Sequence, residues 1–328
     1  MLTYAVILFN LGGPDSLEAV EPFLYNLFCD HDIFKIPAGQ KLFAKMISKY
    51  RSRKVKARYE QIGGKSPINE WTEIQRRMLK DELLKEIPNM EVFTAMRYWH
   101  PMIRKVAQTV SSIGFDKIVL LPLYPHYSVT TTGSSFHEWQ RYYQGDPKRL
   151  VYVDAYPEHA DYISALNERI EEAILSFPRE VRKEIQLVFS AHGTPVSLVK
   201  KGDPYSQHIK QTVARVMALR GHSHDFHLCY QSKVGPVKWL EPATGTVIQE
   251  LGRKNKKQIL VIPVSFVSDH IETLHELEIE YREIAHQAGI ENYVVMKGLN
   301  DSVPFCAALK EIAIAALHQE AAQGRRIQ

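Results

Sequence analysis

The sequence predicts an α/β protein of two Rossmann-like, doubly wound halves, each with a parallel sheet flanked by helices. Short continuous apolar runs, such as residues 259–264, are typical of strands buried on both faces. Segments with helical periodicity separate these runs, so strand and helix alternate along the chain. The 328 residues leave room for two domains of ordinary size. We therefore expect domains at residues 1–150 and 151–300, followed by a final helical segment at residues 301–328.

The first half is predicted to begin with a strand at residues 4–10. The sequence Gly-Gly-Pro at 12–14 suits a tight turn and a helix start, but no G-x-G-x-x-G fingerprint follows. This absence argues against a nicotinamide or flavin enzyme. The remaining predicted elements of this half are helices at 17–28, 41–58 and 69–86, strands at 92–96 and 117–123, and a helix opening at 130–135.

The second half is predicted to open with a short strand near residues 151–153. A helix at about 158–176 follows, and further strands are expected at 185–189, 226–230, 259–264 and, more weakly, 293–296. The apolar run at 259–264 leads through a serine that can cap a helix into an amphipathic, acidic helix. An alanine-rich helix at about 303–322 closes the chain.

Three glutamates recur every four residues on one face of this acidic helix: Glu272, Glu276 and Glu280. Like charges at this spacing destabilise a helix by about 0.2–0.5 kcal/mol per pair. One interpretation is a solvated face whose first turn complements the helix dipole. The other is a carboxylate track for a cation or for protons, which starts beside His270 at the carboxyl end of a strand, where open parallel sheets bind ligands.

His192 also follows the end of a predicted strand. A neutral imidazole can accept a proton or bind a metal, although a lone histidine is often only a structural hydrogen-bonding group. The polar and aromatic residues after the other strands should gather at the same edge and line one cleft between the halves. No H-E-x-x-H, Walker A loop or G-x-S-x-G is present, so metalloprotease, phosphate-loop NTPase and α/β-hydrolase functions lack support.

Charge and cysteine content restrict the cellular setting. The net charge of +4 gives no general affinity for nucleic acid, and the three separated cysteines predict neither disulfides nor a cysteine-only metal site. No secretion signal or spanning segment is recognised, so a cytoplasmic location is expected. Residues 41–58 carry eight Lys or Arg and no acid, interleaved with apolar residues. This helix is suited to an anionic membrane surface or anionic substrate groups. A solvated face is the alternative, and a nucleic-acid patch is a weaker one.

Nine short motifs, in order along almost the whole chain, resemble the ferrochelatase family, whose members insert ferrous iron into a porphyrin. They are N-L-G-G-P at 10–14, I-G-G-K-S-P at 62–67, R-Y at 97–98, Y-P at 124–125, T-T-G-S-S at 131–135, S-A-H at 190–192, G-D-P-Y at 202–205, Q-S-K-V-G-P at 231–236 and S-D-H-I-E-T-L at 268–274.

The resemblance implies two Rossmann-like domains with a tetrapyrrole between them and a C-terminal helix that returns toward the first domain. It places His192 and Glu272 at the ring interior as the catalytic residues, with Glu276 and Glu280 continuing a metal path outward from them. It also implies a widened π-turn in the acidic helix. Whether the histidine removes pyrrole protons or holds iron is left open.

The resemblance further implies a substrate-binding set. Arg51, Lys54, Tyr59 and Ser66 match the family's propionate-side residues, and Leu11 matches the apolar residue of members that use protoporphyrin IX. The other residues expected at the substrate are Arg97, Tyr98, Tyr124, Ser128, Tyr205, Trp239, Phe266 and His270.

Cofactor and partner expectations follow from the same resemblance. Family members with a [2Fe-2S] cluster carry a cysteine where this chain has Val129, and three more in a C-terminal extension, whereas no cysteine follows Cys306 here. We expect no permanently bound cofactor, with Fe2+ as a substrate. Protoporphyrin IX and an anionic membrane surface, at the inner face of the cytoplasmic membrane, are the other expected partners. No nucleic acid is expected, and the chain should be a monomer or a weak homodimer.

Two other functions remain as alternatives. One is a chelatase for another tetrapyrrole, of coproporphyrin III or sirohydrochlorin type; sirohydrochlorin chelatases use paired histidines. The other is a carrier that binds haem or porphyrin without catalysis.

Overall fold

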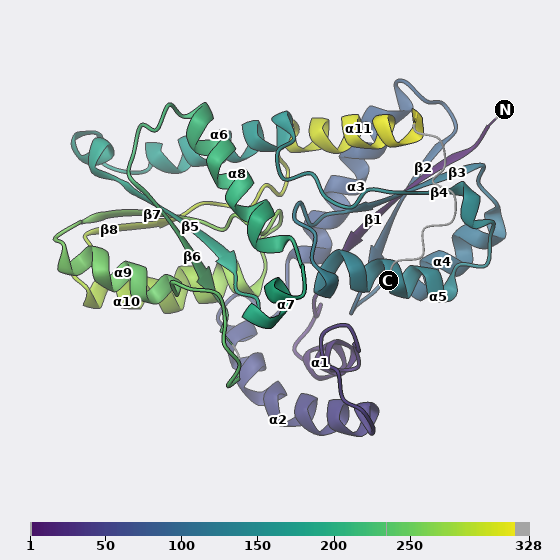
Figure 1. Ribbon diagram of the computed structural model, residues 1–328, viewed down its shortest axis with the longest axis horizontal. Coiled ribbons are helices and arrows are strands. Elements are labelled where there is room, and N and C mark those ends of the chain that lie inside the picture. Colours follow the sequence, from purple (N-terminus) through teal and green to yellow (C-terminus); the bar gives the residue numbers. More distant parts are fainter. Residues whose placement is uncertain (1, 234, 319–328) are drawn as a thin grey trace. The chain divides into compact units, whose positions relative to one another are not determined.

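The computed structural model describes residues 2–233 and 235–318, which form two compact units (Figure 1). Of the described residues, 2–156 and 306–318 form the first unit, and the second unit lies within Pro157–Phe305. Among the described residues, no helix combines the length and the apolar character needed to cross a bilayer.

The first unit is built on a parallel sheet of four strands. These strands are β1 (Tyr4–Asn10), β2 (Met90–Met96), β3 (Lys117–Pro122) and β4 (Leu150–Tyr152), in the order β2-β1-β3-β4. The central strand β1 is buried from Ala5 onward, as its nearly continuous apolar sequence requires. On one face, Phe9 packs edge-on against Phe136 and Trp139, with ring centroids 5.8 and 5.7 Å away.

Helices cover both faces of this first sheet (Figure 1). Helices α4 (Ile103–Ile113) and α5 (Ser134–Tyr142) lie on one face, and α3 (Ile68–Leu84) and α11 (Val303–His318) lie on the other. The pair α1 (Val20–Phe28) and α2 (Gln40–Glu60) packs together outside this layer. Two short helices complete the unit, the π-helix η1 (Val129–Gly133) and the 3-10 helix η2 (Pro147–Arg149).

The second unit repeats the topology of the first. Its strands β5 (Gln186–His192), β6 (Phe226–Gln231), β7 (Gln258–Ile262) and β8 (Asn292–Val295) are parallel and run in the order β6-β5-β7-β8. In both units the first strand is central, and a π-helix follows the third strand.

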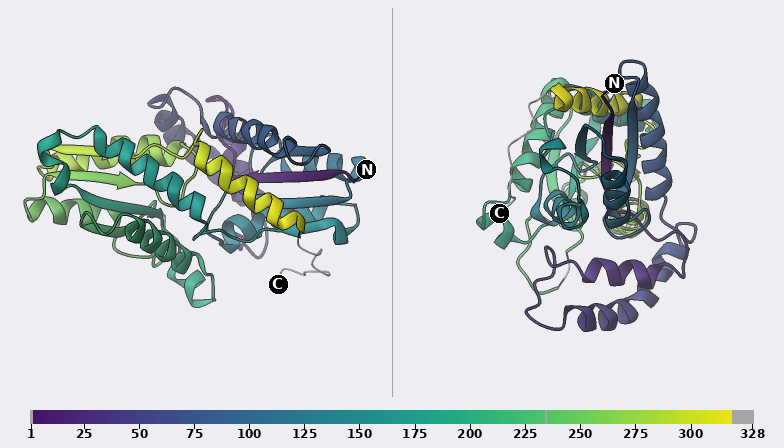
Figure 2. Two further views of the ribbon diagram at one scale, coloured as in Figure 1. Left: turned by 90° about the horizontal axis from the view of Figure 1, so that it is seen from above. Right: turned by 90° about the vertical axis from the view of Figure 1, so that its right-hand side faces the viewer.

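The helices of the second unit lie on both faces of its sheet, as Figures 1 and 2 show. Helices α6 (Ala160–Leu175) and α8 (Tyr205–Leu219) cover one face, and α9 (Thr244–Arg253) and α10 (Tyr281–Gln287) cover the other. Val247, Ile248 and Leu251 of α9 pack there on β5 and β7, together with Leu277. The remaining helices are η3 (Arg179–Glu184), α7 (Val196–Lys200) and the π-helix η4 (Glu272–Glu280).

The predicted α/β class with two parallel sheets is confirmed, and two details of the prediction are wrong. The short strand near residue 151 does not open the second half, because Leu150–Tyr152 pairs with β3 in the first sheet. The acidic helix does not start near Ser265: residues 263–270 form a loop, and the helix begins at Ile271. The predicted closing helix is observed as far as His318, and its last residues, 319–322, lie outside the described part of the chain.

Candidate functional site

His192 is the last residue of β5, and its backbone and ring are both held in place. Its N–H donates to Ser265 Oγ at 2.9 Å, and its carbonyl accepts from the Tyr205 hydroxyl at 3.0 Å. Its Nδ1 lies 2.7 Å from the carbonyl oxygen of Gly193, which can only accept, so Nδ1 carries the proton. In the neutral ring the lone pair is therefore on Nε2, which lies 3.7 Å from Glu272 Oε1.

Glu272 begins the π-helix η4 and lies between two imidazoles. Its Oε1 is 3.7 Å from His192 Nε2, and its Oε2 is 3.7 Å from His270 Nε2. The Oε2 atom is buried and accepts no hydrogen bond from any described residue. Burial alone would raise the pKa of Glu272, but His192 and His270 outweigh that effect and hold the pKa below its ordinary value. At neutral pH the carboxylate is therefore ionised.

His270 has the same tautomer as His192 and shares an aromatic neighbour with it. Its Nδ1 donates to the carbonyl of Ser268 at 3.1 Å, which leaves the lone pair on Nε2 facing Glu272. The ring of Phe266 lies 4.4 Å from the His270 ring and 6.3 Å from the His192 ring, edge-on to both. Strand β5, the loop at 263–270 and the helix η4 thus bring two imidazole rings, one carboxylate and an apolar ring together.

Glu276 differs from Glu272 because both of its carboxylate oxygens accept hydrogen bonds. Ser232 donates its N–H to Oε1 at 2.8 Å and its hydroxyl to Oε2 at 2.5 Å, while Gln231 and Tyr281 donate at 3.4 and 3.2 Å. Ser232 makes these contacts from a left-handed conformation, with φ of 64°. Burial and the neighbouring charge of Glu272 raise the pKa of Glu276, and the Ser232 bonds offset part of that rise.

Glu280 continues the glutamate series at the end of η4, where it is partly exposed and its Oε1 is 3.7 Å from His275 Nδ1. The expected π-turn is present: the Tyr281 N–H donates to the carbonyl of Glu276, five residues back. Among the described residues, His192 and these glutamates bring no three ligand atoms within 4.8 Å of one another. The group is therefore an open series of ligands and not a closed cage.

Tyr205 and Trp239 support the end of β5. Tyr205 is buried, which raises the pKa of its hydroxyl, and it acts as a donor to the His192 carbonyl. A Cβ atom at position 193 would lie 2.7 Å from the Gln231 carbonyl and 3.2 Å from the Trp239 ring, so only glycine fits beside His192.

In the first unit, the residues predicted at the propionates lie on or near α2. Lys54 is exposed, and Arg51 is half-buried with its guanidinium 5.8 Å from the Phe28 ring centre. Neither forms an ion pair with a described residue. Tyr59 and Ser66 are buried, and the N–H of Ser66 donates to the Pro14 carbonyl at 2.8 Å. Leu11, directly after β1, is half-buried.

Arg97 and Tyr98 belong to a buried polar cluster around Asp30. The Tyr98 hydroxyl donates to Asp30 Oδ2 at 2.6 Å, and Arg97 Nη2 is 3.1 Å from the same oxygen. Ser134 donates to Asp30 and accepts from Arg97 Nε at 2.7 Å. Burial raises the pKa of Tyr98. Sequence reasoning missed Asp30, because an isolated aspartate in a helical hairpin carries no signal of its partners.

Tyr124 and Ser128 follow β3. Tyr124 is buried, which raises its pKa, and Ser128 Oγ accepts from the N–H of Thr130 at 3.3 Å, capping the π-helix η1.

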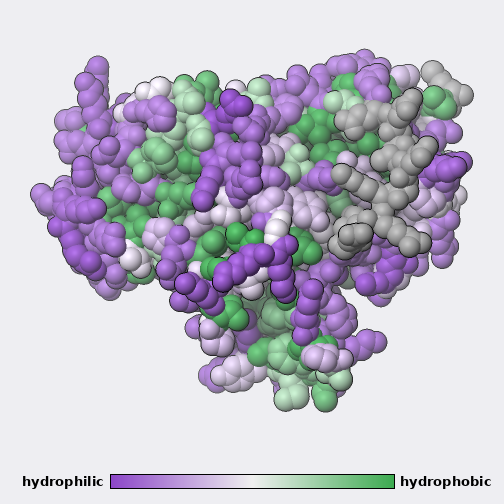
Figure 3. Space-filling model, viewed as in Figure 1, coloured by the Kyte–Doolittle hydropathy of each residue, from purple (hydrophilic) through white to green (hydrophobic). Residues whose placement is uncertain are grey.

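A basic and apolar surface lies on α2. Its exposed apolar side chains include Leu42 (64% exposed), Met46 (65%) and Tyr50 (82%), which alternate with lysines. Figure 3 shows apolar side chains next to hydrophilic ones over α1 and α2, in the lower part of that view.

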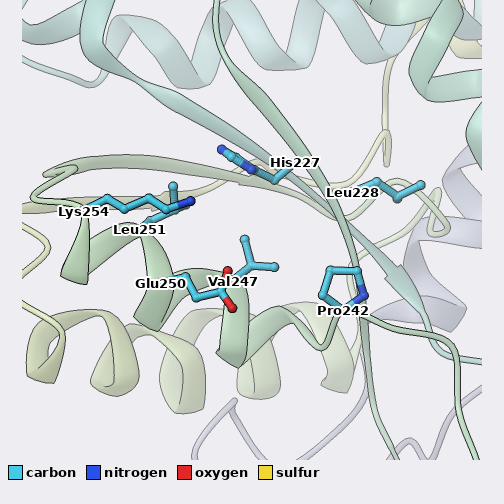
Figure 4. Close-up of a pocket in the computed structure, with 7 residues that line it drawn as sticks. All are labelled: His227, Leu228, Pro242, Val247, Glu250, Leu251 and Lys254. Atoms are coloured by element: carbon cyan, nitrogen blue, oxygen red, sulfur yellow. The ribbon is translucent and has the colours of Figure 1, made fainter.

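A pocket of about 190 Å³ lies elsewhere in the second unit, between β6 and α9 (Figure 4). Val247 and Leu251 line it together with His227 and Leu228 of β6. It contains none of the predicted site residues.

Comparisons with known proteins decide the family. The ferrochelatase family profile matches residues 3–317, which is nearly the whole chain. This chain belongs to the ferrochelatase family. The ferrochelatase of Geotalea uraniireducens is 46% identical over 94% of this chain and 96% of its own length. That of Aquifex aeolicus is 44% identical, with 94% and 97% covered. The ferrochelatase of a Synechococcus strain is 40% identical over 97% of this chain and 83% of its own length.

Solved chelatase structures support the fold assignment. SirB from Bacillus subtilis with Fe3+ has a TM-score of 0.57 at 12% identity, covering 98% of this chain and 96% of its own. The sirohydrochlorin chelatase SirB from Bacillus subtilis subspecies spizizenii, in complex with cobalt, has a TM-score of 0.52 at 11% identity, with 96% and 95% covered. At these identities the likeness is one of fold. The predicted resemblance to ferrochelatases is thus confirmed, and the π-helix is the structural feature it implied in advance.

Proposed function

We propose that this chain inserts Fe2+ into protoporphyrin IX, forms protohaem and releases two protons. The observation that carries the proposal is the arrangement of two imidazole Nε2 atoms on either side of one ionised carboxylate, each 3.7 Å from it. Membership of the ferrochelatase family supports iron insertion into a porphyrin. The choice of porphyrin and the role of each residue are our proposals.

In this proposal His192 acts as the base. The bond from Nδ1 to Gly193 leaves Nε2 free to accept a pyrrole proton, and the Glu272 carboxylate stabilises the imidazolium that forms. Each of the two pyrrole N–H groups gives up one proton, and the porphyrin dianion binds Fe2+, so the charges balance. Tyr205 and Ser265 keep the end of β5 rigid while this occurs.

The glutamates supply the path for iron and for the departing protons. Carboxylates are hard oxygen ligands suited to a divalent cation. Glu272 is ionised, whereas Glu276 holds a proton more tightly, so neighbouring members of the series differ in proton affinity. Because their ligand atoms form no closed cage, the cation is passed on and not retained. Glu280, partly exposed, is the outer member.

The first unit supplies substrate recognition. Arg51 and Lys54, which have no ion-pair partner among the described residues, bind the propionates, with Tyr59 and Ser66 beside them. The polar groups of Arg97 and Tyr98 already bind Asp30. These two residues therefore affect the substrate indirectly, by holding the cluster around Asp30 in place. Leu11 selects the apolar edge of protoporphyrin IX over the more acidic coproporphyrin III.

We also propose that α2 rests on the anionic inner face of the cytoplasmic membrane, into which porphyrin and haem partition. Its exposed apolar side chains and its lysines are the combination that such a surface binds. We assign no resident cofactor: iron is the substrate, and Val129 stands where family members with a [2Fe-2S] cluster carry a cysteine. We propose a monomer or weak homodimer that does not bind nucleic acid.

Zinc insertion followed by fluorescence tests the function. Purified protein should convert protoporphyrin IX to its zinc complex with turnover, and coproporphyrin III should react more slowly. Stoichiometric binding of protoporphyrin without turnover would identify a carrier instead. A faster reaction with coproporphyrin III would show that this porphyrin, and not protoporphyrin IX, is the preferred substrate. The proposal that the protein inserts a metal ion would still hold.

A further inference from the structure

The carboxylate of Glu276 already accepts as many hydrogen bonds as its two oxygens can hold. A carboxylate oxygen has two lone pairs, so the group accepts four bonds in all. Its Oε1 accepts from the Ser232 N–H at 2.8 Å and from the Tyr281 hydroxyl at 3.2 Å. Its Oε2 accepts from the Ser232 hydroxyl at 2.5 Å and from Gln231 Nε2 at 3.4 Å. A cation needs one of these lone pairs, so one donor has to leave before a cation binds Glu276.

Two of the three donor residues are built into regular elements. Gln231 is buried and ends β6, and the buried Ser190 hydroxyl donates to its Oε1 at 2.8 Å, which turns Nε2 toward Glu276. Tyr281 begins α10. Ser232, in contrast, follows β6 and lies in no helix or strand, so its displacement breaks no ladder or helical bond. Ser232 is therefore the donor that can leave at the smallest structural cost.

The backbone of Ser232 supports the same choice. Its φ of 64° lies in the left-handed region, which a residue with a Cβ atom seldom adopts. Such a conformation persists where surrounding contacts hold it. Ser232 forms the two shortest bonds to Glu276, one to each oxygen. When a cation takes the carboxylate, Ser232 loses these two contacts and can relax to an ordinary conformation.

We infer that Ser232 is a positioning residue that competes with the cation for Glu276. Its two donors hold the carboxylate, and the cation binds Glu276 only when Ser232 withdraws. This inference rests on the proposed function, because the cation is the metal substrate of that reaction. The competition keeps the metal ion from remaining at Glu276, since Ser232 regains both bonds as the ion moves on.

Steady-state zinc insertion tests this role, with Zn2+ varied at saturating protoporphyrin IX and at one pH. Ser232→Gly removes the hydroxyl donor but keeps the N–H, and glycine adopts the left-handed conformation without strain. With one competing donor fewer, the KM for Zn2+ should fall roughly tenfold, while the KM for protoporphyrin IX stays the same. The matched control is Ser223→Gly, at an exposed position before β6, which should change neither constant.

Two further variants separate this role from a purely structural one. Glu276→Gln removes the carboxylate, so adding Ser232→Gly to it should not change the KM for Zn2+ any further. Tyr281→Phe removes the longer bond to Oε1 and should lower the KM for Zn2+ by less than Ser232→Gly does. This conservative change keeps the test valid if the glycine variant fails to fold.

The possible outcomes distinguish this inference from the proposed function. Suppose that the wild type inserts zinc and the KM for Zn2+ is unchanged or higher in Ser232→Gly, or in Tyr281→Phe where the glycine variant does not fold. The competition is then wrong and the proposed function stands. A fall of equal size in the Glu276→Gln background would also overturn the inference, because Ser232 would act elsewhere. If the wild type inserts no zinc, the proposed function fails, and this inference fails with it.

Discussion

At the scale of single residues, the properties of the site depend on which side-chain atoms already form hydrogen bonds. His192 and His270 both donate Nδ1–H to backbone carbonyls, so each presents an Nε2 lone pair toward Glu272. Glu272 has a buried oxygen that accepts no hydrogen bond within the described part of the chain, while Glu276 has donors on both oxygens. Two glutamates four residues apart thus have opposite pKa shifts.

Replacing His192 tests its role as the base. His192→Ala should lower kcat for zinc insertion by about 10²–10⁴-fold, because the proton acceptor is lost. Porphyrin binding, followed by quenching of protein fluorescence, should persist. The control His286→Ala removes an exposed histidine of α10 and should leave kcat unchanged. Equal rates for wild type and His192→Ala would remove this residue from the mechanism.

The raised pKa of Glu276 predicts a pH dependence of stability. A carboxyl whose pKa is higher in the folded state than in the unfolded state contributes stability at low pH and loses it as pH rises through the folded pKa. Glu276→Gln cannot ionise, so its Tm relative to wild type should increase from pH 4 to pH 8. The exposed control Glu168→Gln should show no such trend. A relative Tm that falls with pH would contradict the direction of the shift.

At the scale of elements, the helices η4 and α2 each present one group of the residues on which the proposed function depends. The π-helix η4 starts with Glu272 and ends with Glu280, so its widened turns carry the whole glutamate series. The helix α2 carries Arg51, Lys54 and the exposed apolar side chains. Ala44, Ser48 and Ser52 lie on its buried side. Small residues on that side allow close packing against α1.

The cations of α2 should act on substrate binding. Lys54→Ala should raise the KM for protoporphyrin IX several-fold with little change in kcat, because a propionate contact that is equal in ground state and transition state affects binding alone. Steady-state zinc insertion over a range of porphyrin concentrations measures both constants. Lys210→Ala in the second unit is the matched control. A fall in kcat at constant KM would argue against a propionate role for Lys54.

The apolar side chains of α2 should govern membrane binding. The double change Leu42→Ser and Met46→Ser should reduce co-sedimentation with vesicles that contain anionic lipid, since less apolar area enters the interface. Leu175→Ser, which removes a side chain 63% exposed on α6, is the control and should have no effect. Binding that ignores both the substitution and added salt would refute the proposed membrane surface.

At the scale of the whole molecule, the two units have sheets of equivalent strand order, and each unit has its own hydrophobic core. The first unit is assembled from parts of the chain that are distant in sequence. Helix α11 joins the first unit from the far end of the sequence: Lys310 binds Glu86 at 2.9 Å, and Lys117 donates to the carbonyl of Leu317. Helix α11 supplies buried side chains to the first unit. The stability of the first unit therefore depends on residues that come after the whole second unit in the sequence.

A cavity in α11 should therefore destabilise the protein. Leu309 is fully buried, and Leu309→Ala should lower the free energy of unfolding by about 2–5 kcal/mol. Urea unfolding followed by circular dichroism measures this change. Leu175→Ala, at an exposed position, should change it by less than about 0.5 kcal/mol. A loss as small as that of the control would mean that α11 is dispensable for the core.

The α/β class, most strand positions and the family could be predicted from the sequence, because buried strands and short motifs consist of contiguous residues. The roles assigned to His192 and Glu272 stay predictions. The prediction from the sequence placed Leu150–Tyr152 in the wrong half, since a three-residue strand carries no information about its partner. The sequence could not show that Asp30 contacts Arg97 and Tyr98, or that Ser232 donates hydrogen bonds to Glu276. These hydrogen bonds and ion pairs join residues that are distant in sequence. Only the folded chain determines which donor lies beside which acceptor.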